Sequence, residues 1–379
     1  MSFLAICLLA FLFAFDFQNV LAWRRVQVLD LAPLPTNDFT IVIPLYGDPR
    51  YFAERERLLH LKERILVAID VGVAAMRSFA DELEEEGWRV FRTRVAVPGP
   101  PTLMQAVIEA DRIDTTYVIR LDADTYVGDE LPRAVAAAKA DAADLASVKV
   151  LVHNRGGLVG RLQALEYEMA MLSRHFRPWL TSGACFVART SAAREIFRRH
   201  SMWFPGEDLE TGRIAHALRL RVRHLDVRVH TDAPATWRAL FRQRRLWWAG
   251  NFRHAITNFD RNALHTPVWT FYYIALVWCG VYFKWWTAVW AAAHPHYGVR
   301  YLPFLLTVYV VVTFAGNWQV RSRWMVLFPP YALAQAMLMP TVGSVYYAIV
   351  AWRKRDLGRY RFGVLRRRVV VSGEISGRA

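Results

Sequence analysis

Four long stretches of this chain carry almost no charged side chains, and they lie at its two ends. The stretches are residues 3–23, 267–290, 301–320 and 324–352. Their only charged residues are Asp16 and Lys284. A helix needs about 20 apolar residues to cross the roughly 30 Å of hydrocarbon in a bilayer. The pattern therefore predicts an N-terminal transmembrane anchor at residues 1–23 and C-terminal transmembrane segments within residues 267–352.

The first and last stretches limit how the chain crosses the membrane. The first lacks the basic start and the small-residue cleavage site of a secretory signal peptide, which favours an uncleaved anchor. The last would measure about 44 Å as one helix, and it contains Pro329, Pro330, Pro340 and Gly343. It could be a re-entrant hairpin, or an interfacial helix followed by a short span, so the number of crossings stays open.

Positive charge is concentrated beside these stretches. The formal net charge is +15, and arginines follow the first stretch at Arg24 and Arg25 and the third at Arg321 and Arg323. A basic tail at residues 353–379 holds nine Arg or Lys against two acidic residues. The positive-inside rule predicts that all three clusters are cytoplasmic. Attraction to anionic membrane lipids explains this charge, so we expect membrane lipids and no nucleic acid as partners.

The charged middle of the chain, residues 36–235, alternates short apolar runs with amphipathic segments. Runs typical of buried strands lie at 39–47, 64–70, 88–95 and 116–125, and segments typical of helices lie at 76–87 and 102–113. Strands separated by such helices predict an α/β domain with a parallel, doubly wound sheet. Ligands of these sheets bind beyond the carboxyl ends of the strands. Asp70 lies at one such end, and Asp122 and Asp124 lie at another.

The motif at residues 122–125, DADT, places two carboxylates two residues apart after an apolar strand. Carboxylate oxygens with open coordination positions suit Mg²⁺ or Mn²⁺ holding a diphosphate. A turn cap is the alternative, because a D-x-D pattern arises about once by chance in a chain of this length. The position directly after a buried strand favours the metal site.

Two further stretches could carry chemistry. WFPGEDLETG (203–212) clusters Glu207, Asp208 and Glu210, where one acid could act as a general base. A helix N-terminus, whose dipole favours acids, explains the cluster equally well. TSGACFVAR (181–189) begins with small residues. These either let a substrate approach the backbone or simply start a strand.

An unusual cluster of arginines and tryptophans lies within residues 236–260, in the sequence WRALFRQRRLWWAGNFR (237–253). Arginine forks bind phosphate oxygens in bidentate fashion, and indole faces stack on sugar rings. The candidate ligands are Gln243, Arg244, Arg245, Trp247 and Trp248. An interfacial amphipathic helix with snorkelling arginines is the alternative.

Taken in order, these stretches resemble the processive, membrane-embedded members of glycosyltransferase family 2, which include cellulose, chitin and hyaluronan synthases. The similarity runs from about residue 40 to residue 250 and more loosely through the C-terminal stretches. IVIPLYGD (41–48) resembles the family's first strand, and DADT resembles its metal-diphosphate motif. GED (206–208) resembles the motif that ends in the catalytic base, and QRRLW (243–247) stands where the family has Q-x-x-R-W.

The resemblance implies a GT-A domain, which is a nucleotide-sugar-binding, Rossmann-like α/β fold, at residues 36–235 in the cytosol with flanking transmembrane helices. It implies that Asp208 is the catalytic base. The implied ligands are Pro44, Tyr46, Asp70 and Asp122 for the nucleotide, Asp122 and Asp124 for Mg²⁺ or Mn²⁺, and Gly183, Glu207, Gln243, Arg244, Arg245, Trp247 and Trp248 for the acceptor and diphosphate.

The chain departs from the family pattern at three positions. Val71 replaces a second acid, Pro100 replaces a lysine, and Leu246 replaces the arginine before the tryptophan. On a helix, Arg244 or Arg245 would share a face with Trp248 and could substitute for that arginine. The departures therefore bear on whether the enzyme is processive more than on whether it transfers a sugar.

The expected activity is inverting transfer of a sugar from a UDP-sugar to a growing β-linked polysaccharide. The protein would be a multi-pass protein of the cell membrane with a cytoplasmic catalytic domain. One alternative is a non-processive enzyme that adds a single sugar to polyprenyl-phosphate or another membrane lipid. An alternative of another class is a catalytically silent membrane scaffold.

Overall fold

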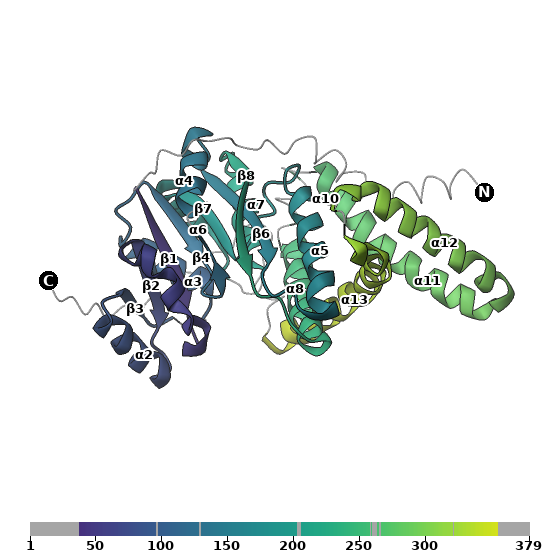
Figure 1. Ribbon diagram of the computed structural model, residues 1–379, viewed down its shortest axis with the longest axis horizontal. Helices are drawn as coiled ribbons and strands as arrows, with labels where there is room; N and C mark the ends of the chain where they lie inside the picture. The colour runs from purple at the N-terminus through teal and green to yellow at the C-terminus, as the bar shows by residue number, and fades with distance from the viewer. Residues whose placement is uncertain are drawn as a thin grey trace. The chain divides into compact units, whose positions relative to one another are not determined.

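The computed structural model describes residues 38–354, except 96–97, 129, 203–205, 258, 260–263, 265–266 and 321. The predicted anchor at residues 1–23 and nearly all of the basic tail at residues 353–379 lie outside the described residues. The chain divides into two compact units, whose elements are labelled in Figure 1. Among the described residues, the sheet unit holds 38–153 and 177–232, and the helical unit holds 154–176 and 233–354.

The described part of the sheet unit contains one eight-stranded sheet in the order β3-β2-β1-β4-β7-β6-β8-β5. The strands are β1 (Phe39–Leu45), β2 (Ile65–Asp70), β3 (Arg89–Thr93), β4 (Tyr117–Leu121), β5 (Thr125–Tyr126), β6 (Leu145–Val152), β7 (Cys185–Arg189) and β8 (Val222–Thr231). The predicted α/β class and the four predicted strands are confirmed. Their β-branched, apolar runs suit a pleated surface that is buried on both faces.

The prediction of a wholly parallel sheet is wrong, because β7 and β5 run against their neighbours. β7 lies between β4 and β6, and its first residue, Cys185, pairs with Leu121, the last residue of β4. The chain thus enters β7 from the edge where the parallel strands end, and from there it can only run in the opposite direction. The segment that precedes β7 is consequently held at the carboxyl edge of the sheet.

The helices of the sheet unit include a group that covers one face of the sheet. The unit contains η1 (Pro49–Phe52), η2 (Arg55–Arg64), α2 (Ala74–Glu85), α3 (Pro100–Glu109), α4 (Glu130–Ala140), α6 (Thr190–Arg199) and α7 (Glu207–Ala217). Side chains of α3, α6 and α7 join those of the strands in one core, for example Leu103, Ile196 and Ile214 with Val42. The predicted helices at 76–87 and 102–113 are confirmed as α2 and α3. α3 begins earlier than predicted, at Pro100, because proline fits the first helical turn.

The helical unit gathers α5 with the C-terminal helices. It contains α5 (Gly157–Ser173), α8 (Trp237–Thr257), α10 (Pro267–Tyr273), the π-helical η3 (Ile274–Cys279), α11 (Gly280–Ala293), α12 (Pro295–Gly316), η4 (Trp318–Val320), η5 (Arg323–Val326) and α13 (Phe328–Lys354). α8 and α13 pack together over a long contact. Leu162 of α5, Leu240 of α8 and Phe328 of α13 share one apolar cluster. The residues predicted as an interfacial amphipathic helix within 236–260 form α8, and their place at a membrane interface stays a prediction.

The apolar C-terminal stretches form helices, but their lengths differ from the prediction. Among the described residues, one helix, Phe328–Val350, is long and apolar enough to cross a membrane by length and composition. Leu306–Gly316 is a shorter apolar helix. α13 is continuous through Pro340, so the last stretch is not a hairpin that turns at this proline. Pro329 and Pro330 lie in its first turn, where a missing N–H costs no helical hydrogen bond.

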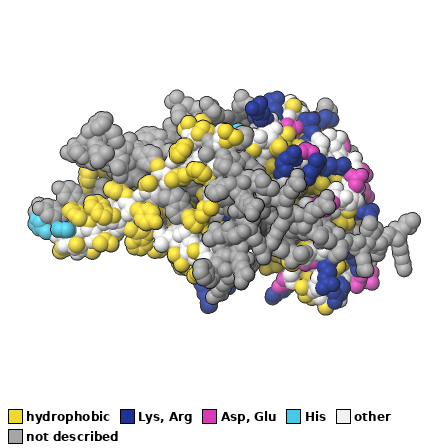
Figure 2. All heavy atoms as spheres, turned by 180° about the vertical axis from the view of Figure 1, so that it is seen from behind, with side chains coloured by type: hydrophobic (Ala, Val, Ile, Leu, Met, Phe, Trp, Pro, Cys, Tyr) yellow, Lys and Arg dark blue, Asp and Glu magenta, His cyan; other side chains and the backbone are white. Residues whose placement is uncertain are grey.

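The surfaces of the two units differ in polarity. In Figure 2, hydrophobic side chains cover much of the helical unit, whereas Lys, Arg, Asp and Glu gather on the sheet unit. Large exposed apolar side chains of the helical unit include Val268, Phe271, Tyr282, Trp286, Val289 and Val299. Exposed apolar surface of this extent is typical of proteins that contact lipid or another protein.

The position of α7 predicts a stability effect at Gly212. A Cβ atom at Gly212 would lie 2.0 Å from the carbonyl oxygen of Trp179, which is backbone and cannot rotate away. We expect Gly212→Ala to lower the thermal unfolding midpoint by about 2–10 °C, as overpacked sites do. Gly128→Ala is the matched control, because a Cβ there meets no atom within 4 Å. Equal midpoints for the two variants would contradict this packing of α7.

Candidate functional site

The carboxyl edge of the parallel strands collects the predicted nucleotide ligands. Pro44 is buried near the end of β1, Tyr46 follows β1, and Asp70 is the last residue of β2. The Oδ1 atom of Asp70 accepts hydrogen bonds from the backbone N–H groups of Gly72 at 3.2 Å and Val95 at 3.4 Å. β1 separates β2 from β4, so the ends of β2 and β4 lie about 10 Å apart.

The predicted metal motif forms a tight loop between β4 and β5. The backbone N–H of Thr125 donates to the carbonyl of Asp122 at 3.0 Å, which closes the turn. The Asp122 side chain does not cap this turn, because its Oδ1 atom accepts from Arg120 Nη2 at 2.7 Å. Arg57 Nη2 donates to the carbonyl of Ala123 at 2.7 Å and holds the middle of the motif. Backbone groups and Arg57 thus shape the loop, and the Asp124 side chain is exposed.

Arg120 is a residue of the site that the sequence analysis did not select. It lies in β4 and is only 3% exposed. Its Nη2 atom donates to Asp122 and also to Glu207 Oε1 at 3.2 Å. A buried guanidinium requires carboxylate partners. The sequence signal was therefore present, as an arginine inside the apolar run YVIRL (117–121).

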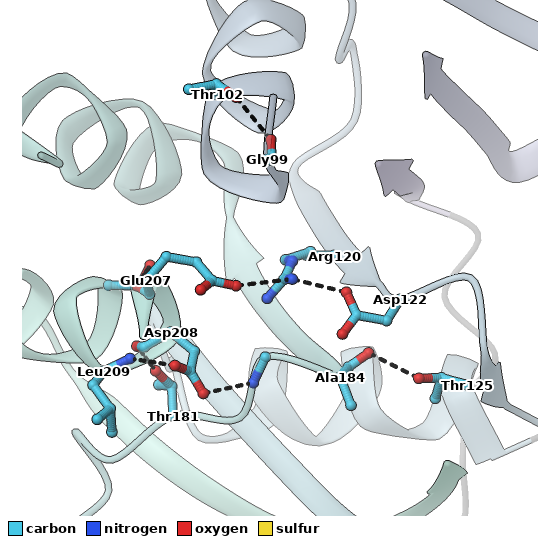
Figure 3. Close-up of polar contacts among 12 residues, drawn as sticks. Gly99, Thr102, Arg120, Asp122, Thr125, Thr181, Ala184, Glu207, Asp208 and Leu209 are labelled. Carbon is cyan, nitrogen blue, oxygen red and sulfur yellow. Dashed lines mark hydrogen bonds and ion pairs between the residues drawn. The ribbon is translucent and has the colours of Figure 1, made fainter. Parts of the chain in front are cut away.

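The first turn of α7 brings two more acids to the same place. Asp208 Oδ2 accepts from the backbone N–H of Gly183 at 3.0 Å, and Oδ1 accepts from that of Leu209 at 2.9 Å. The Thr181 hydroxyl donates to the carbonyl of Asp208. Figure 3 shows Glu207 on one side of Arg120 and Asp122 on the other, with Asp208 facing the segment that contains Ala184.

Glycine at position 183 is explained by this geometry. A Cβ atom at Gly183 would lie 3.2 Å from Arg120 Nη1 and 3.5 Å from Asp208 Oδ2. In the structure the groups nearest Gly183 are protein side chains, and the predicted approach of a substrate to this backbone stays a prediction. The structure brings Asp122, Gly183, Glu207 and Asp208 together.

Burial and like charges raise the pKa values of several of these groups. Burial raises the pKa of Glu207 from 4.5 to about 8, with Arg120 opposing the shift and Asp208 and Asp122 adding to it. Burial also raises the pKa of Asp122 to about 6, again opposed by Arg120. The pKa of Tyr46 is raised by burial and then by the carboxylates of Glu207 and Asp122, so its hydroxyl belongs to the same electrostatic environment.

The acids of the DADT loop fit a divalent cation that is shared with a substrate. Within the described residues, no group of three or more His, Cys, Asp and Glu side chains is arranged to hold a metal ion. Mg²⁺, however, is usually bound by one or two protein carboxylates, with substrate phosphates and water completing the octahedron. Asp122 and Asp124 provide that pair of oxygen donors on one short loop.

The remaining predicted ligands lie on α8 in the helical unit, where Arg244 has a structural role. Arg244 is buried, and its Nη2 atom donates to Glu166 Oε2 of α5 at 2.8 Å. The hydroxyl of Tyr331 in α13 donates to the same oxygen at 2.6 Å. The Arg244 guanidinium also lies 4.3 Å from the centre of the Trp247 ring. Arg244 therefore joins α8 to α5 and α13.

The residues near Arg244 on α8 differ in how far their side chains are exposed to solvent. Trp248 packs against Gly343 of α13, and Gln243 is half-buried. Arg245 is half-buried, with its guanidinium 4.4 Å from the centre of the Tyr346 ring. Trp247 is 44% exposed. The predicted binding of acceptor and diphosphate by this group of residues stays a prediction, and Arg245 and Trp247 are its most accessible members.

Comparison with known proteins identifies a family and a fold. The sequence profile described as glycosyl transferase family group 2 matches residues 117–352. The structure of the mannosyltransferase PcManGT from Pyrobaculum calidifontis, in complex with GDP-Man and Mn²⁺, matches with a TM-score of 0.59 and 16% identity, over 89% of this chain and 97% of that one. At that identity the likeness shows the fold alone.

A second solved structure, S. aureus TarS, covers 86% of this chain and 94% of its own at 14% identity. Its TM-score of 0.37 is too low to support any inference. No curated protein matches the chain. The family profile and the PcManGT match together confirm an α/β fold of the GT-A kind.

The raised pKa of Glu207 predicts how stability changes with pH. The folded chain holds this proton more tightly than the unfolded chain, so the protonated carboxyl stabilises the fold below about pH 4.5, and this contribution is lost as the pH rises through about 8. Glu207→Gln keeps a neutral side chain at every pH. We therefore expect the unfolding midpoint of the variant, minus that of the wild type, to increase between about pH 5 and about pH 8.

Thermal unfolding at a series of pH values measures this difference. Glu109→Gln is the matched control, because Glu109 is an exposed glutamate on α3, and its difference should stay constant. A difference for Glu207→Gln that stays level or decreases with pH would show that Glu207 is not buried among acids.

Proposed function

This chain belongs to glycosyl transferase family group 2, and we propose that it transfers a sugar from a UDP-sugar to a growing β-linked polysaccharide, with inversion at the anomeric carbon. The observation that supports the proposal most directly is the convergence of Asp122, Glu207 and Asp208 around Arg120. An acid placed to hold a metal-bound diphosphate and an acid placed to remove a proton then belong to one site. Sugar transfer from a nucleoside diphosphate requires both.

The donor would bind beyond the ends of β1, β2 and β4. Asp70 would accept a hydrogen bond from an N–H of the base, because backbone amides orient its other oxygen. Pro44 and Tyr46 would line the nucleotide site from the end of β1. Asp122 and Asp124 would hold Mg²⁺ or Mn²⁺, and the bound ion would offset the charge that develops on the leaving diphosphate.

Asp208 would act as the general base. Two backbone N–H groups orient its carboxylate, which can then take the proton of the acceptor hydroxyl. As the proton moves to Asp208, the acceptor oxygen forms a bond to the anomeric carbon from the face opposite the diphosphate. The bond between that carbon and the diphosphate oxygen breaks, and its electron pair leaves with the nucleoside diphosphate. A single in-line displacement of an α-linked donor gives a β-linked product.

The helical unit would bind the acceptor and hold the enzyme at the membrane. Arg245 and Trp247 would contact the diphosphate and the sugar rings, since their side chains are more accessible than that of Arg244. The exposed apolar side chains of α10 to α13 and the length of Phe328–Val350 support a place in the cell membrane. We propose a multi-pass protein with its sheet unit in the cytoplasm.

Transfer of a single sugar to a membrane lipid phosphate is the second candidate, and the environment of Arg244 favours it. Leu246 stands where the processive enzymes have an arginine. Of the two possible substitutes, Arg244 is buried against Glu166, and Arg245 is half-buried over the Tyr346 ring. With fewer arginines available at this place, the enzyme would hold the end of a polymer less firmly.

The size of the product distinguishes the two candidates. Membranes containing the protein would be incubated with labelled UDP-glucose, UDP-N-acetylglucosamine, UDP-glucuronate or GDP-mannose. We expect label from a UDP-sugar to enter a product of high molecular mass. A single lipid-soluble adduct would establish the second candidate instead, and incorporation from GDP-mannose alone would overturn the assignment of the donor as a UDP-sugar.

Substitution of the proposed base tests whether the chain is an enzyme at all. We expect Asp208→Asn to lower kcat by about 10³-fold, the usual contribution of a general base, while donor binding measured by calorimetry is retained. Asp111→Asn is the control and should keep full activity, because Asp111 is exposed and its φ of 52° suits asparagine. Turnover that is unchanged in Asp208→Asn would favour the catalytically silent scaffold.

A further inference from the structure

Arg120 is the buried cation at the centre of the site, and its placement is fixed by the sheet. It lies on β4, whose backbone is paired with β1 on one side and with β7 on the other. Its side chain is 3% exposed, so the guanidinium has left water and depends on the protein for compensation. Removing a cation from water costs several kcal/mol unless carboxylates surround it. The residues that compensate Arg120 therefore have to remain close to it.

A single nitrogen of Arg120 connects two parts of the site. Nη2 donates to Asp122 Oδ1 at 2.7 Å and to Glu207 Oε1 at 3.2 Å. Asp122 belongs to the loop that would hold the donor diphosphate. Glu207 belongs to the first turn of α7 and directly precedes the proposed base, Asp208. Figure 3 shows Arg120 between these two carboxylates.

Two other nitrogens of Arg120 are buried beside the same groups. Within the described residues, Nε and Nη1 have no hydrogen-bond partner although both are buried. Nη1 lies where a Cβ of Gly183 would be only 3.2 Å away, and Gly183 donates its N–H to Asp208. The hydrogen bonds of Arg120 go to Asp122 in the donor loop and to Glu207, which precedes the proposed base.

We propose that Arg120 is a positioning residue of the transfer reaction, which holds the donor-side carboxylate of Asp122 and the base-side Glu207 at a fixed separation. This inference rests on the proposed function, since it assigns Asp122 to the donor and Asp208 to the acceptor hydroxyl. Reaction requires the attacking oxygen and the anomeric carbon to approach within about 3–3.5 Å in line, and a displacement of about 1 Å can cost about 100-fold in rate. Without Arg120, the loop and the first turn of α7 would lose the donor that both of them share.

The experiment compares four variants with the wild type: Arg120→Met, Arg120→Lys, Glu207→Met, which removes the acceptor oxygen, and the double variant Arg120→Met/Glu207→Met. We expect Arg120→Met to lower kcat by about 100-fold while the donor KM and the affinity for UDP, measured by calorimetry, change by less than about threefold. Arg120→Lys should retain about a tenth of the wild-type kcat, because one ammonium group can still reach one carboxylate. The double variant should be no more than about threefold slower than Arg120→Met, because both changes break the same contact.

Arg92→Met is the matched control. Arg92 is also an arginine of a parallel strand that bridges two carboxylates, those of Asp81 and Glu84, at 2.6 Å and 2.7 Å. Its contacts lie on α2, and it takes no part in the proposed site. We expect wild-type kcat from this variant.

Several outcomes would overturn the proposal. One is Arg120→Met with a lowered unfolding midpoint but wild-type kcat per folded molecule, which would make Arg120 only structural. Another is a double variant whose loss equals the product of the two single losses. If Arg120→Met does not fold, Arg120→Lys decides: a reduced kcat at an unchanged unfolding midpoint supports the proposal, and a wild-type kcat overturns it. Asp208→Asn distinguishes a failure of the positioning role of Arg120 from a failure of the proposed function. Full activity in that variant would overturn the proposed function itself.

Discussion

The pairing of antiparallel β7 with β4 determines where the acids of the site lie. The ladder continues one residue beyond β4, because the backbone N–H of Asp122 donates to the carbonyl of Ala184 at 2.9 Å. The segment before β7 is thereby held against the start of the DADT loop. In the same segment, the N–H of Gly183 donates to Asp208 on α7. Two backbone N–H groups thus join the loop that would hold the donor to the helix that carries the proposed base.

The position of α7 is determined by close backbone contacts as well as by its apolar face. The carbonyl of Glu207 accepts from the Thr211 hydroxyl and lies within hydrogen-bond distance of His200 Nε2, both at 2.9 Å. The carbonyl of Trp179 leaves no room for a Cβ atom at Gly212, which would lie 2.0 Å from its oxygen. Such contacts leave a helix little room to slide, because backbone atoms cannot change rotamer to relieve a clash. The first turn of α7 is therefore held in place at the buried site, although it carries charged groups there.

Local patterns in the sequence predicted the elements of the sheet unit but not all of their relations. Apolar runs identified the strands that end in Asp70 and Leu121, because burial on both faces of a sheet leaves a continuous signal over a few residues. The direction of β7 could not be predicted, since it depends on where the chain returns after α5. The pairs Arg120–Glu207 and Arg244–Glu166 join residues 87 and 78 positions apart. The periodic pattern of apolar residues along a sequence gives no information about contacts at such separations. The pairing of Arg244 with Glu166 of the same unit could not be seen in the sequence, and the assignment of Arg244 to a ligand stays a prediction.

Charge balance at the sheet edge restricts the form in which a donor can enter. The carboxyl groups at this edge are those of Asp122, Asp124, Glu207 and Asp208, and the buried guanidinium is that of Arg120. Even with Glu207 protonated at neutral pH, as its raised pKa implies, the acids outnumber Arg120. A nucleoside diphosphate adds further negative charge, and two like charges 4 Å apart near a protein surface repel by about 4 kcal/mol. A divalent cation held by Asp122 and Asp124 would offset this repulsion. The donor and the cation should therefore bind with positive cooperativity, each raising the affinity of the site for the other.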